Sequence, residues 1–413
     1  MQHRFLLIIL VFIIGGCASV KKGYEAVPYD FPNPVDTNTK TIELQEKRAY
    51  LFENSNIGAD NQFDGARLND FQRLNENSYV AIIKPENIPI NPSPWYAFRI
   101  WSQDQKKLNI TLKYENAKHR YTPKLSVDGI SWHRMDPESI TFNNDSTEAY
   151  FEVEVDSDTL WISAQEIINS GNVRSWCGKM AEQKNIAFNI IGKSRLNRDI
   201  YSLFVSNGSK KKKDLIAIIS RQHPPEVTGY MAMESFVERI VNGDQLSKDF
   251  LQKYNILVYP LLNPDGVDLG HWRHNAGGVD LNRDWAYYRQ PEIKQIADHM
   301  VSTSKRLKNR IIFGMDFHST YWDVYYTLDD SLVSHLPGFK DQWLEAIERE
   351  IANYEINDHP SGLGAPVSKS WFFTQFQAEG VTYEIGDNTP RAFIKKKGAI
   401  SATKMMEILL GNQ

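Results

Sequence analysis

The chain has 413 residues, which is long enough for two domains, or for one large domain with a substantial core. Hydrophobic residues make up 41% of it and charged residues 24%, an ordinary composition for a soluble protein. The formal net charge is -4, so the bulk charge excludes the basic excess of a nucleic-acid-binding protein, and we expect no nucleic-acid partner.

The first 17 residues have the pattern of an export signal. A short basic region, Met1 to Arg4, precedes an unbroken apolar run from Phe5 to Ile14 that is too short to span a bilayer comfortably. The run ends in Gly15-Gly16-Cys17, which resembles a bacterial lipobox. The resemblance implies that Cys17 is lipidated and anchors the protein to a membrane of the cell envelope, facing the periplasm or the surface. An ordinary signal peptide or a retained anchor is the alternative.

Residues 18–44 predict a polar tether. Three prolines and a Thr/Asn/Lys stretch cannot bury a core, so we expect this segment to stay extended. Residues 45–170 predict an all-β sandwich, because short alternating runs are separated by turn residues. The clearest of these runs are Tyr96–Trp101, Leu108–Tyr114, Ala149–Val155 and Thr159–Ala164.

Residues 185–413 have a different pattern, in which apolar strands alternate with amphipathic helices. This alternation predicts an α/β domain with a mostly parallel or mixed sheet. The predicted strands are Leu215–Ile219, Tyr254–Pro260 and Ile311–Asp316, and the predicted helices are Val227–Val241, Gln342–Tyr354 and Ile400–Leu410. The basic run Lys395–Lys397 is predicted to be a solvated turn before the last helix.

A candidate zinc site combines His223, Glu226 and His318. His223 and Glu226 follow one predicted strand and His318 ends another, and ligands in open α/β sheets gather at the carboxyl ends of strands. Zinc accepts imidazole nitrogen and carboxylate oxygen, and a catalytic zinc keeps one position open. His-x-x-Glu is common by chance, and a lone strand-end His is usually hydrogen-bonded to backbone. The three residues together therefore carry the prediction of one zinc ion per chain.

Five further polar residues complete a hydrolase site. Arg273 is suited to stabilising an oxyanion, and Glu384, a single carboxylate in an apolar run, to acting as a general base. Arg283 offers a bidentate fork for a carboxylate, and Asn282 adds a hydrogen bond. Asp280 is suited to holding the far nitrogen of a zinc-bound His. The alternatives are a surface charge cluster and, for Glu384, an ion pair with Arg391 or a Lys.

In their order and spacing, these residues resemble the M14 family of zinc carboxypeptidases over roughly residues 185–410, and most closely its cytosolic-carboxypeptidase-like branch. Two segments point to that branch, Leu262–Val267 and Phe63–Arg67. The resemblance implies a mixed-sheet carboxypeptidase-type domain. It also implies that His223, Glu226 and His318 bind zinc, that Glu384 activates water, that Arg273 stabilises the oxyanion, that Asn282 and Arg283 bind the substrate carboxylate, and that Asp280 orients His223.

Two features of the chain depart from the family pattern. Pro224-Pro225 stands where the family usually has Pro-Gly, and Ser361–Pro366 contains no Tyr to cap the substrate. By the family's spacing, Lys369 lines the pocket for the terminal side chain, which would favour an acidic residue such as glutamate or diaminopimelate. The alternative is a solvated Lys369.

Three functions follow from this pattern. The first is an anchored zinc carboxypeptidase that acts on peptides or peptidoglycan stem peptides with a free terminal carboxylate. The second is an inactive envelope binding protein, which an intact Glu384 and Arg273 argue against. The third is a peptidoglycan amidase or endopeptidase, which would not need Asn282 and Arg283.

Overall fold

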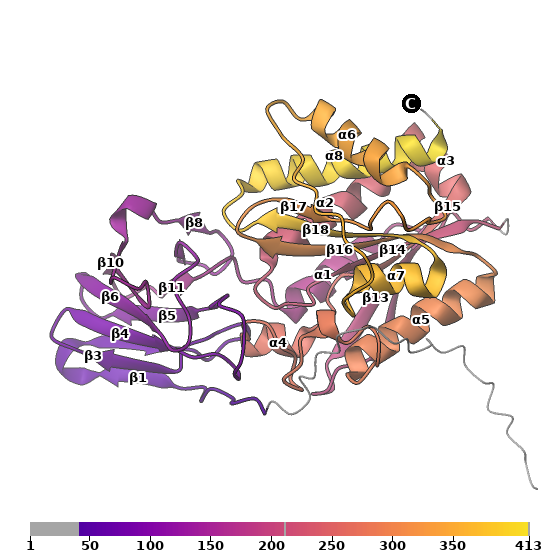
Figure 1. Ribbon diagram of the computed structural model, residues 1–413. Coiled ribbons are helices and arrows are strands. Elements are labelled where there is room, and N and C mark those ends of the chain that lie inside the picture. The colour runs from indigo at the N-terminus through magenta and orange to yellow at the C-terminus, as the bar shows by residue number, and fades with distance from the viewer. Residues whose placement is uncertain (1–40, 210–211, 412–413) are drawn as a thin grey trace, which may run out of the picture.

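The computed structural model describes residues 41–209 and 212–411. The predicted signal segment with Cys17, and residues 18–40 of the predicted tether, lie outside the described residues. The described part of the chain contains no helix that is both long and apolar enough to cross a bilayer. An all-β region comes first and a mixed α/β domain follows from about residue 170, which confirms the predicted fold class (Figure 1).

The β domain consists of two sheets that share one core. The first has the order β1 (Ala49–Phe52), β2 (Ile57–Asp60), β5 (Ala97–Ser102), β11 (Leu160–Ser163), β7 (Lys124–Ser126), β8 (His133–Arg134). The second has the order β3 (Asp70–Arg73), β4 (Ser78–Ile83), β6 (Lys106–Tyr114), β10 (Glu148–Val155), β9 (Thr141–Phe142). On β6, every second side chain from Leu108 to Tyr114 is buried, as the alternating sequence requires.

The mixed α/β domain is built on a seven-stranded sheet. Its order is β12 (Ile186–Lys193), β13 (Asp199–Val205), β15 (Tyr254–Tyr259), β14 (Asp214–Ser220), β16 (Ile311–Thr320), β18 (Glu379–Gly386), β17 (Val324–Tyr326). The four central strands β15, β14, β16 and β18 are parallel, and the outer pairings are antiparallel. Central β14 is apolar on both faces because helices cover both sides of the sheet.

Alternate residues of β14 point into two separate cores. Ile216 and Ile218 belong to one core and Leu215, Ala217 and Ile219 to the other. The first core receives side chains from α1 (Ser170–Met180), α2 (Val227–Ile240), α3 (Gln245–Lys253), α6 (Phe339–Glu350) and α8 (Arg391–Leu410). The second receives them from α5 (Pro291–Leu307) and α7 (Ser368–Phe376), and the short α4 (Pro264–Leu269) follows β15.

The prediction for the basic run Lys395–Lys397 is wrong. The run lies inside α8, and Lys397 is fully buried. Its Nζ donates to Asp323 Oδ2 over 2.6 Å and faces the rings of Tyr325, Tyr354 and Tyr383. A buried ammonium needs such a carboxylate, and Asp323 lies 74 residues away in sequence, so local composition could not reveal the pair.

Candidate active site

The three predicted metal ligands meet at the carboxyl edge of the sheet. His223 follows β14, Glu226 is the N-cap residue of α2, and His318 lies near the end of β16. The parallel pairing of β14 with β16 ends at Ser220 and Phe317, so the residues that follow this pair lie at the same edge of the sheet. The predicted placement of these three residues is confirmed.

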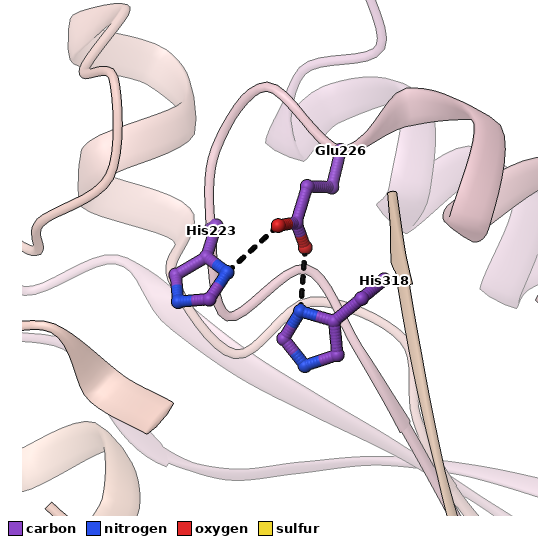
Figure 2. Close-up of side chains that lie close together, drawn as sticks. All are labelled: His223, Glu226 and His318. Carbon is purple, nitrogen blue, oxygen red and sulfur yellow. Dashed lines mark hydrogen bonds and ion pairs between the residues drawn. The ribbon is translucent and has the colours of Figure 1, made fainter. Parts of the chain in front are cut away.

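The ligand atoms of this cluster converge on one point (Figure 2). His223 Nδ1 lies 2.8 Å from Glu226 Oε1, and His318 Nδ1 lies 2.7 Å from Glu226 Oε2. One ligand atom from each residue lies within 4.8 Å of the others. All three side chains are buried, so their ligand atoms are shielded from bulk water.

The Nε2 atom of each imidazole contacts a second carboxylate, on the side of the ring away from Glu226. His223 Nε2 lies 2.9 Å from Asp280 Oδ1, and His318 Nε2 lies 2.7 Å from Asp316 Oδ2. Each Nε2 therefore donates its proton to a carboxylate, which leaves the Nδ1 lone pair for a metal. Asp280 takes the position that the sequence predicted. Asp316 had no predicted role, although it precedes His318 by two residues and so shares its face of β16.

This donor set fits zinc. Two imidazole nitrogens and one carboxylate are the ligands of many catalytic zinc sites, and they leave a position for water. Burial would raise the pKa of Glu226, but the neighbouring His223 and His318 outweigh it and hold that pKa well below its usual range. Glu226 is therefore an anionic ligand, and the cluster forms a single zinc site.

Asp316 gives a testable prediction about metal affinity. Asp316→Asn is expected to weaken zinc binding about 10- to 100-fold, because His318 loses its carboxylate acceptor. Competition with a chromophoric chelator measures the affinity. Asp214→Asn, at the opposite end of β14 where Asp214 pairs with Arg310, is the matched control and should leave zinc binding unchanged. Equal affinity of the Asp316→Asn and wild-type proteins would contradict this role.

Arg273, Asn282 and Arg283 lie on the segment that also carries Asp280. Arg273 Nε donates to Asp280 Oδ2 over 2.8 Å, so one carboxylate holds both this guanidinium and His223. Asn282 Oδ1 accepts from the backbone N–H of Ser368 over 3.0 Å, which fixes the amide. Arg283 Nη1 donates to the carbonyl of Asn282 over 2.8 Å, and its side chain is only half-buried.

Glu384 lies on β18 directly opposite His318 in the parallel register. Its Oε2 is buried and has no hydrogen-bond partner in the described part of the chain. Burial raises the pKa of Glu384, and the nearby carboxylates of Glu226 and Asp316 raise it further against the opposing effect of His318. The alternative partner, Arg391, instead donates to Glu166 over 2.6 Å and 2.8 Å. Glu384 is thus a free carboxyl facing the zinc site.

Residues 173–353 match the Peptidase_M14 family model, described as zinc carboxypeptidase. The matched stretch contains His223, Glu226 and His318, whose ligand atoms converge. Over these residues the mixed α/β domain therefore matches the M14 zinc carboxypeptidase family. The enzyme class predicted from the sequence is therefore confirmed.

Relatives of this zinc carboxypeptidase span both of its domains. An uncharacterized protein of Zymomonas mobilis is 25% identical over 359 residues, which cover 78% of this chain and 86% of that protein. Cytosolic carboxypeptidase 6 of Caenorhabditis elegans is 20% identical over 328 residues, 72% of this chain and 70% of the relative.

Two solved structures share the fold. A metallo-carboxypeptidase from Pseudomonas aeruginosa, in complex with (2-guanidinoethylmercapto)succinic acid, has a TM-score of 0.70 at 17% identity. The alignment covers 86% of this chain and 100% of that one. A metallo-carboxypeptidase from Burkholderia cenocepacia has a TM-score of 0.69 at 19% identity, over 86% of this chain and 98% of that one. The two-domain architecture therefore recurs in bacterial proteins of this class.

In this carboxypeptidase a cavity of about 340 Å³ opens over the zinc site. It is lined by eight residues that the sequence analysis predicted to bind metal, to catalyse hydrolysis or to bind substrate. They are His223, Glu226, His318, Glu384, Arg273, Asn282, Arg283 and Lys369. Asp280 lies behind this wall against His223. The cavity thus brings the predicted catalytic groups and the predicted substrate-binding groups into one space.

Lys369 lines this cavity from the first turn of α7. Its Nζ donates to Thr327 O over 2.5 Å and to Ser361 Oγ over 2.6 Å, and its side chain is buried. Burial lowers the pKa of Lys369 to about 8, and Asp358 and Glu379 act in the opposite direction. Lys369 is therefore not a solvated surface Lys.

The cavity wall also contains residues that had no predicted role, and four of them come from the β domain or from β17. Three come from the β domain and one from β17: Asn91, Ser93, Arg120 and Tyr326. Arg120 donates to Asp387 Oδ2 over 2.8 Å and to the Ser93 hydroxyl, and it lies 4.4 Å from the centre of the Tyr321 ring. No motif surrounds these residues, and only folding brings them to the cavity. Tyr326 is the aromatic residue at the wall, and it comes from a strand rather than from Ser361–Pro366.

Proposed function

We propose that this enzyme removes the C-terminal residue of peptides, including peptidoglycan stem peptides, by zinc-dependent hydrolysis. The single observation that carries the proposal is the shared cavity. There a zinc site, a free carboxyl at Glu384 and the clamp of Asn282 and Arg283 face one another. A clamp for a free carboxylate beside a hydrolytic centre favours exopeptidase cleavage at the carboxyl end.

Each step of the proposed hydrolysis is assigned to a residue that lines the cavity. When bound, zinc supplies Lewis acidity to the scissile carbonyl and to water. Glu384 takes a proton from the attacking water onto its carboxylate and later gives that proton to the leaving amine. The guanidinium of Arg273 stabilises the negative charge that develops on the carbonyl oxygen. Arg283 and Asn282 bind the terminal carboxylate and fix which bond lies beneath Glu384.

A mixed substrate pool tests this function. It contains linear peptides that end in each residue type together with cell-wall stem peptides, and mass spectrometry identifies the products with and without a chelator. Chelator-sensitive loss of a single terminal residue is the expected result. Internal cleavage would favour the amidase or endopeptidase function, and no release by zinc-loaded protein would favour a binding protein.

Lys369 supports a preference for an acidic terminal residue. Its buried ammonium lines the cavity, and a substrate carboxylate would pair with it in a site of low dielectric constant. Lys369→Met keeps the length of the side chain and removes the charge. We expect the ratio of kcat/KM for peptides ending in glutamate to that for peptides ending in leucine to fall about 30-fold or more. Equal losses on both substrates would show that Lys369 has only a structural role.

We also propose that the enzyme is anchored to the cell envelope through a lipid on Cys17. The support is the apolar run Phe5–Ile14, which ends in Gly15-Gly16-Cys17. Metabolic labelling with palmitate tests the anchor, with Cys17→Ser as the unlabelled control. A soluble wild-type protein without label would point to an ordinary signal peptide instead.

A further inference from the structure

The segment that carries Arg273 is bound by the β domain. This segment runs from the end of α4 to the 3-10 turn Leu281–Arg283. The Trp272 side chain is buried in the core of the β domain, and its Nε1 donates to Trp95 O over 3.2 Å. Arg67 Nε donates to Gly270 O over 2.7 Å. Gly270 and Trp272 of this segment are therefore bound to residues of the β domain.

A single buried carboxylate of the β domain holds the backbone on both sides of Arg273. Glu86 is fully buried, and it accepts hydrogen bonds from three consecutive backbone N–H groups. Trp272 N lies 2.8 Å from Oε2, and Arg273 N and His274 N lie 2.9 Å and 2.7 Å from Oε1. Successive N–H groups that converge in this way form an anion-binding nest, so this short stretch of backbone is shaped around Glu86.

Glu86 is ionised in this nest. Burial by itself would raise its pKa, but His271, Arg67, His274 and the Trp272 N–H outweigh burial and hold the pKa of Glu86 below its ordinary value. Hydrogen bonds to an ionised acceptor are about twice as strong as neutral ones. Three of them fix the backbone of Arg273 more firmly than ordinary loop contacts would.

The contacts continue from Glu86 to the zinc site. The Arg273 side chain leaves the segment toward the cavity, where Nε donates to Asp280 Oδ2 over 2.8 Å. The other oxygen of Asp280 lies 2.9 Å from Nε2 of the ligand His223. The order of contacts is Glu86, Arg273, Asp280, His223. A shift of the Arg273 backbone would therefore move the oxyanion-stabilising group and strain the support of a metal ligand.

Other contacts already join the two domains without touching Arg273. Glu166 and Arg391 form an ion pair with distances of 2.6 Å and 2.8 Å, and Arg120 pairs with Asp387. Removing a carboxylate from water is costly, and buried ion pairs are weak contributors to stability. The buried carboxylate of Glu86, which accepts from the Arg273 N–H, therefore indicates that Glu86 positions Arg273 and does more than hold the two domains together.

We propose that Glu86 is a positioning residue for catalysis: through the backbone of residues 272–274, the β domain sets the place of the Arg273 guanidinium. The inference rests on the proposed carboxypeptidase function. It assigns the β domain a part in transition-state stabilisation, in addition to the part of its residues that line the cavity.

Kinetics of Glu86→Gln provide the first test. The amide keeps the size of the side chain, but it loses the charge and turns one N–H donor toward the nest. We expect kcat to fall about 10²-fold while KM stays within about threefold, because a small misplacement of a catalytic group lowers the rate rather than ground-state binding. Glu86→Asp retains the charge and should lose less activity. If Glu86→Gln does not fold, Glu86→Asp takes its place, and kcat equal to that of the wild type would then contradict the proposal.

Glu166→Gln is the matched control. It makes the same chemical change at the same domain interface, on a Glu that pairs with Arg391 and does not line the cavity. It should lower the thermal midpoint and leave kcat nearly unchanged. If Glu166→Gln lowers kcat as much as Glu86→Gln does, Glu86 is a general interface contact and the proposal is wrong.

A double-mutant cycle isolates the route through Arg273. Arg273→Ala alone should cost about 10²- to 10³-fold in kcat. If Glu86 acts through Arg273, adding Glu86→Gln to Arg273→Ala should lower kcat little further. Full additivity of the two losses would overturn the proposal.

Two readouts do not need turnover. Hydrogen exchange of the Trp272, Arg273 and His274 amides should be slow in the wild type and selectively faster in Glu86→Gln, and unchanged exchange overturns the inference. If no substrate is cleaved by the wild type, the proposed function fails separately. Crystal structures then decide the positioning role. A shift of the Arg273 guanidinium by about 1 Å in Glu86→Gln supports it, and superimposable guanidinium groups overturn it.

Discussion

Replacing Glu384 by Gln is expected to lower kcat about 10²- to 10⁴-fold while zinc remains bound. The amide has nearly the same shape as the carboxyl but cannot take a proton from water at neutral pH. Glu384 is not one of the three convergent metal ligands, so the zinc content should not change. Its Oε2 is buried and accepts no hydrogen bond in the described part of the chain, so no neighbouring donor occupies this oxygen.

The measurement pairs kinetics with metal analysis on the same preparation. Zinc content by atomic absorption should be one ion per chain in both the wild type and Glu384→Gln, and only the wild type should release a terminal residue at an appreciable rate. Glu379→Gln is the control. Glu379 lies at the start of the same strand, where it accepts a hydrogen bond from the Ser334 hydroxyl and is not a ligand of the zinc site. Activity that survives in Glu384→Gln would assign the base to another residue.

The sequence was sufficient for the fold class and for the metal ligands, because both depend on local patterns. Period-two alternation predicted β6 and β10, and continuous apolar runs predicted β14 and β16. His223 and His318 each follow or end one of these runs. Once the strands are placed in a parallel sheet, their carboxyl ends must meet at one edge.

The residues that the sequence did not reveal are bound to partners far along the chain. The Glu86 bond to the Arg273 N–H spans 187 residues, and the Arg120 bond to Asp387 spans 267. Neither Glu86 nor Arg120 lies in a motif, since its partner is defined only after two domains have docked. Asp316 is different, because its spacing of two from His318 on a strand could have indicated its role.

The β domain therefore forms part of the wall of the candidate active site. It contributes Arg120 and Ser93 to the cavity wall and binds the backbone of Arg273 through Glu86. Because Trp272 is inserted into its core, the domain cannot separate without pulling on the segment that supports His223. The β domain is thus connected to the support of His223 by the contacts of Glu86 with the Arg273 backbone and of Arg273 with Asp280.

Arg283→Ala is expected to lower kcat/KM about 10²-fold on peptides with a free terminal carboxylate, mainly through KM. The half-buried guanidinium lines the cavity, and its loss leaves a substrate carboxylate without its bidentate partner. On the same peptides with an amidated end, the substitution should have little effect, because an amide offers no charge to Arg283.

Comparison of the free and the amidated peptides distinguishes cleavage at a free carboxyl end from amidase or endopeptidase activity. Arg289→Ala is the matched control, because Arg289 lies in the same region, pairs with Asp284 and does not line the cavity. It should leave kcat/KM nearly unchanged on both peptides. If Arg283→Ala lowers activity equally on free and amidated peptides, or on neither, the enzyme does not recognise a terminal carboxylate. An amidase or endopeptidase would then be the better description of this zinc hydrolase.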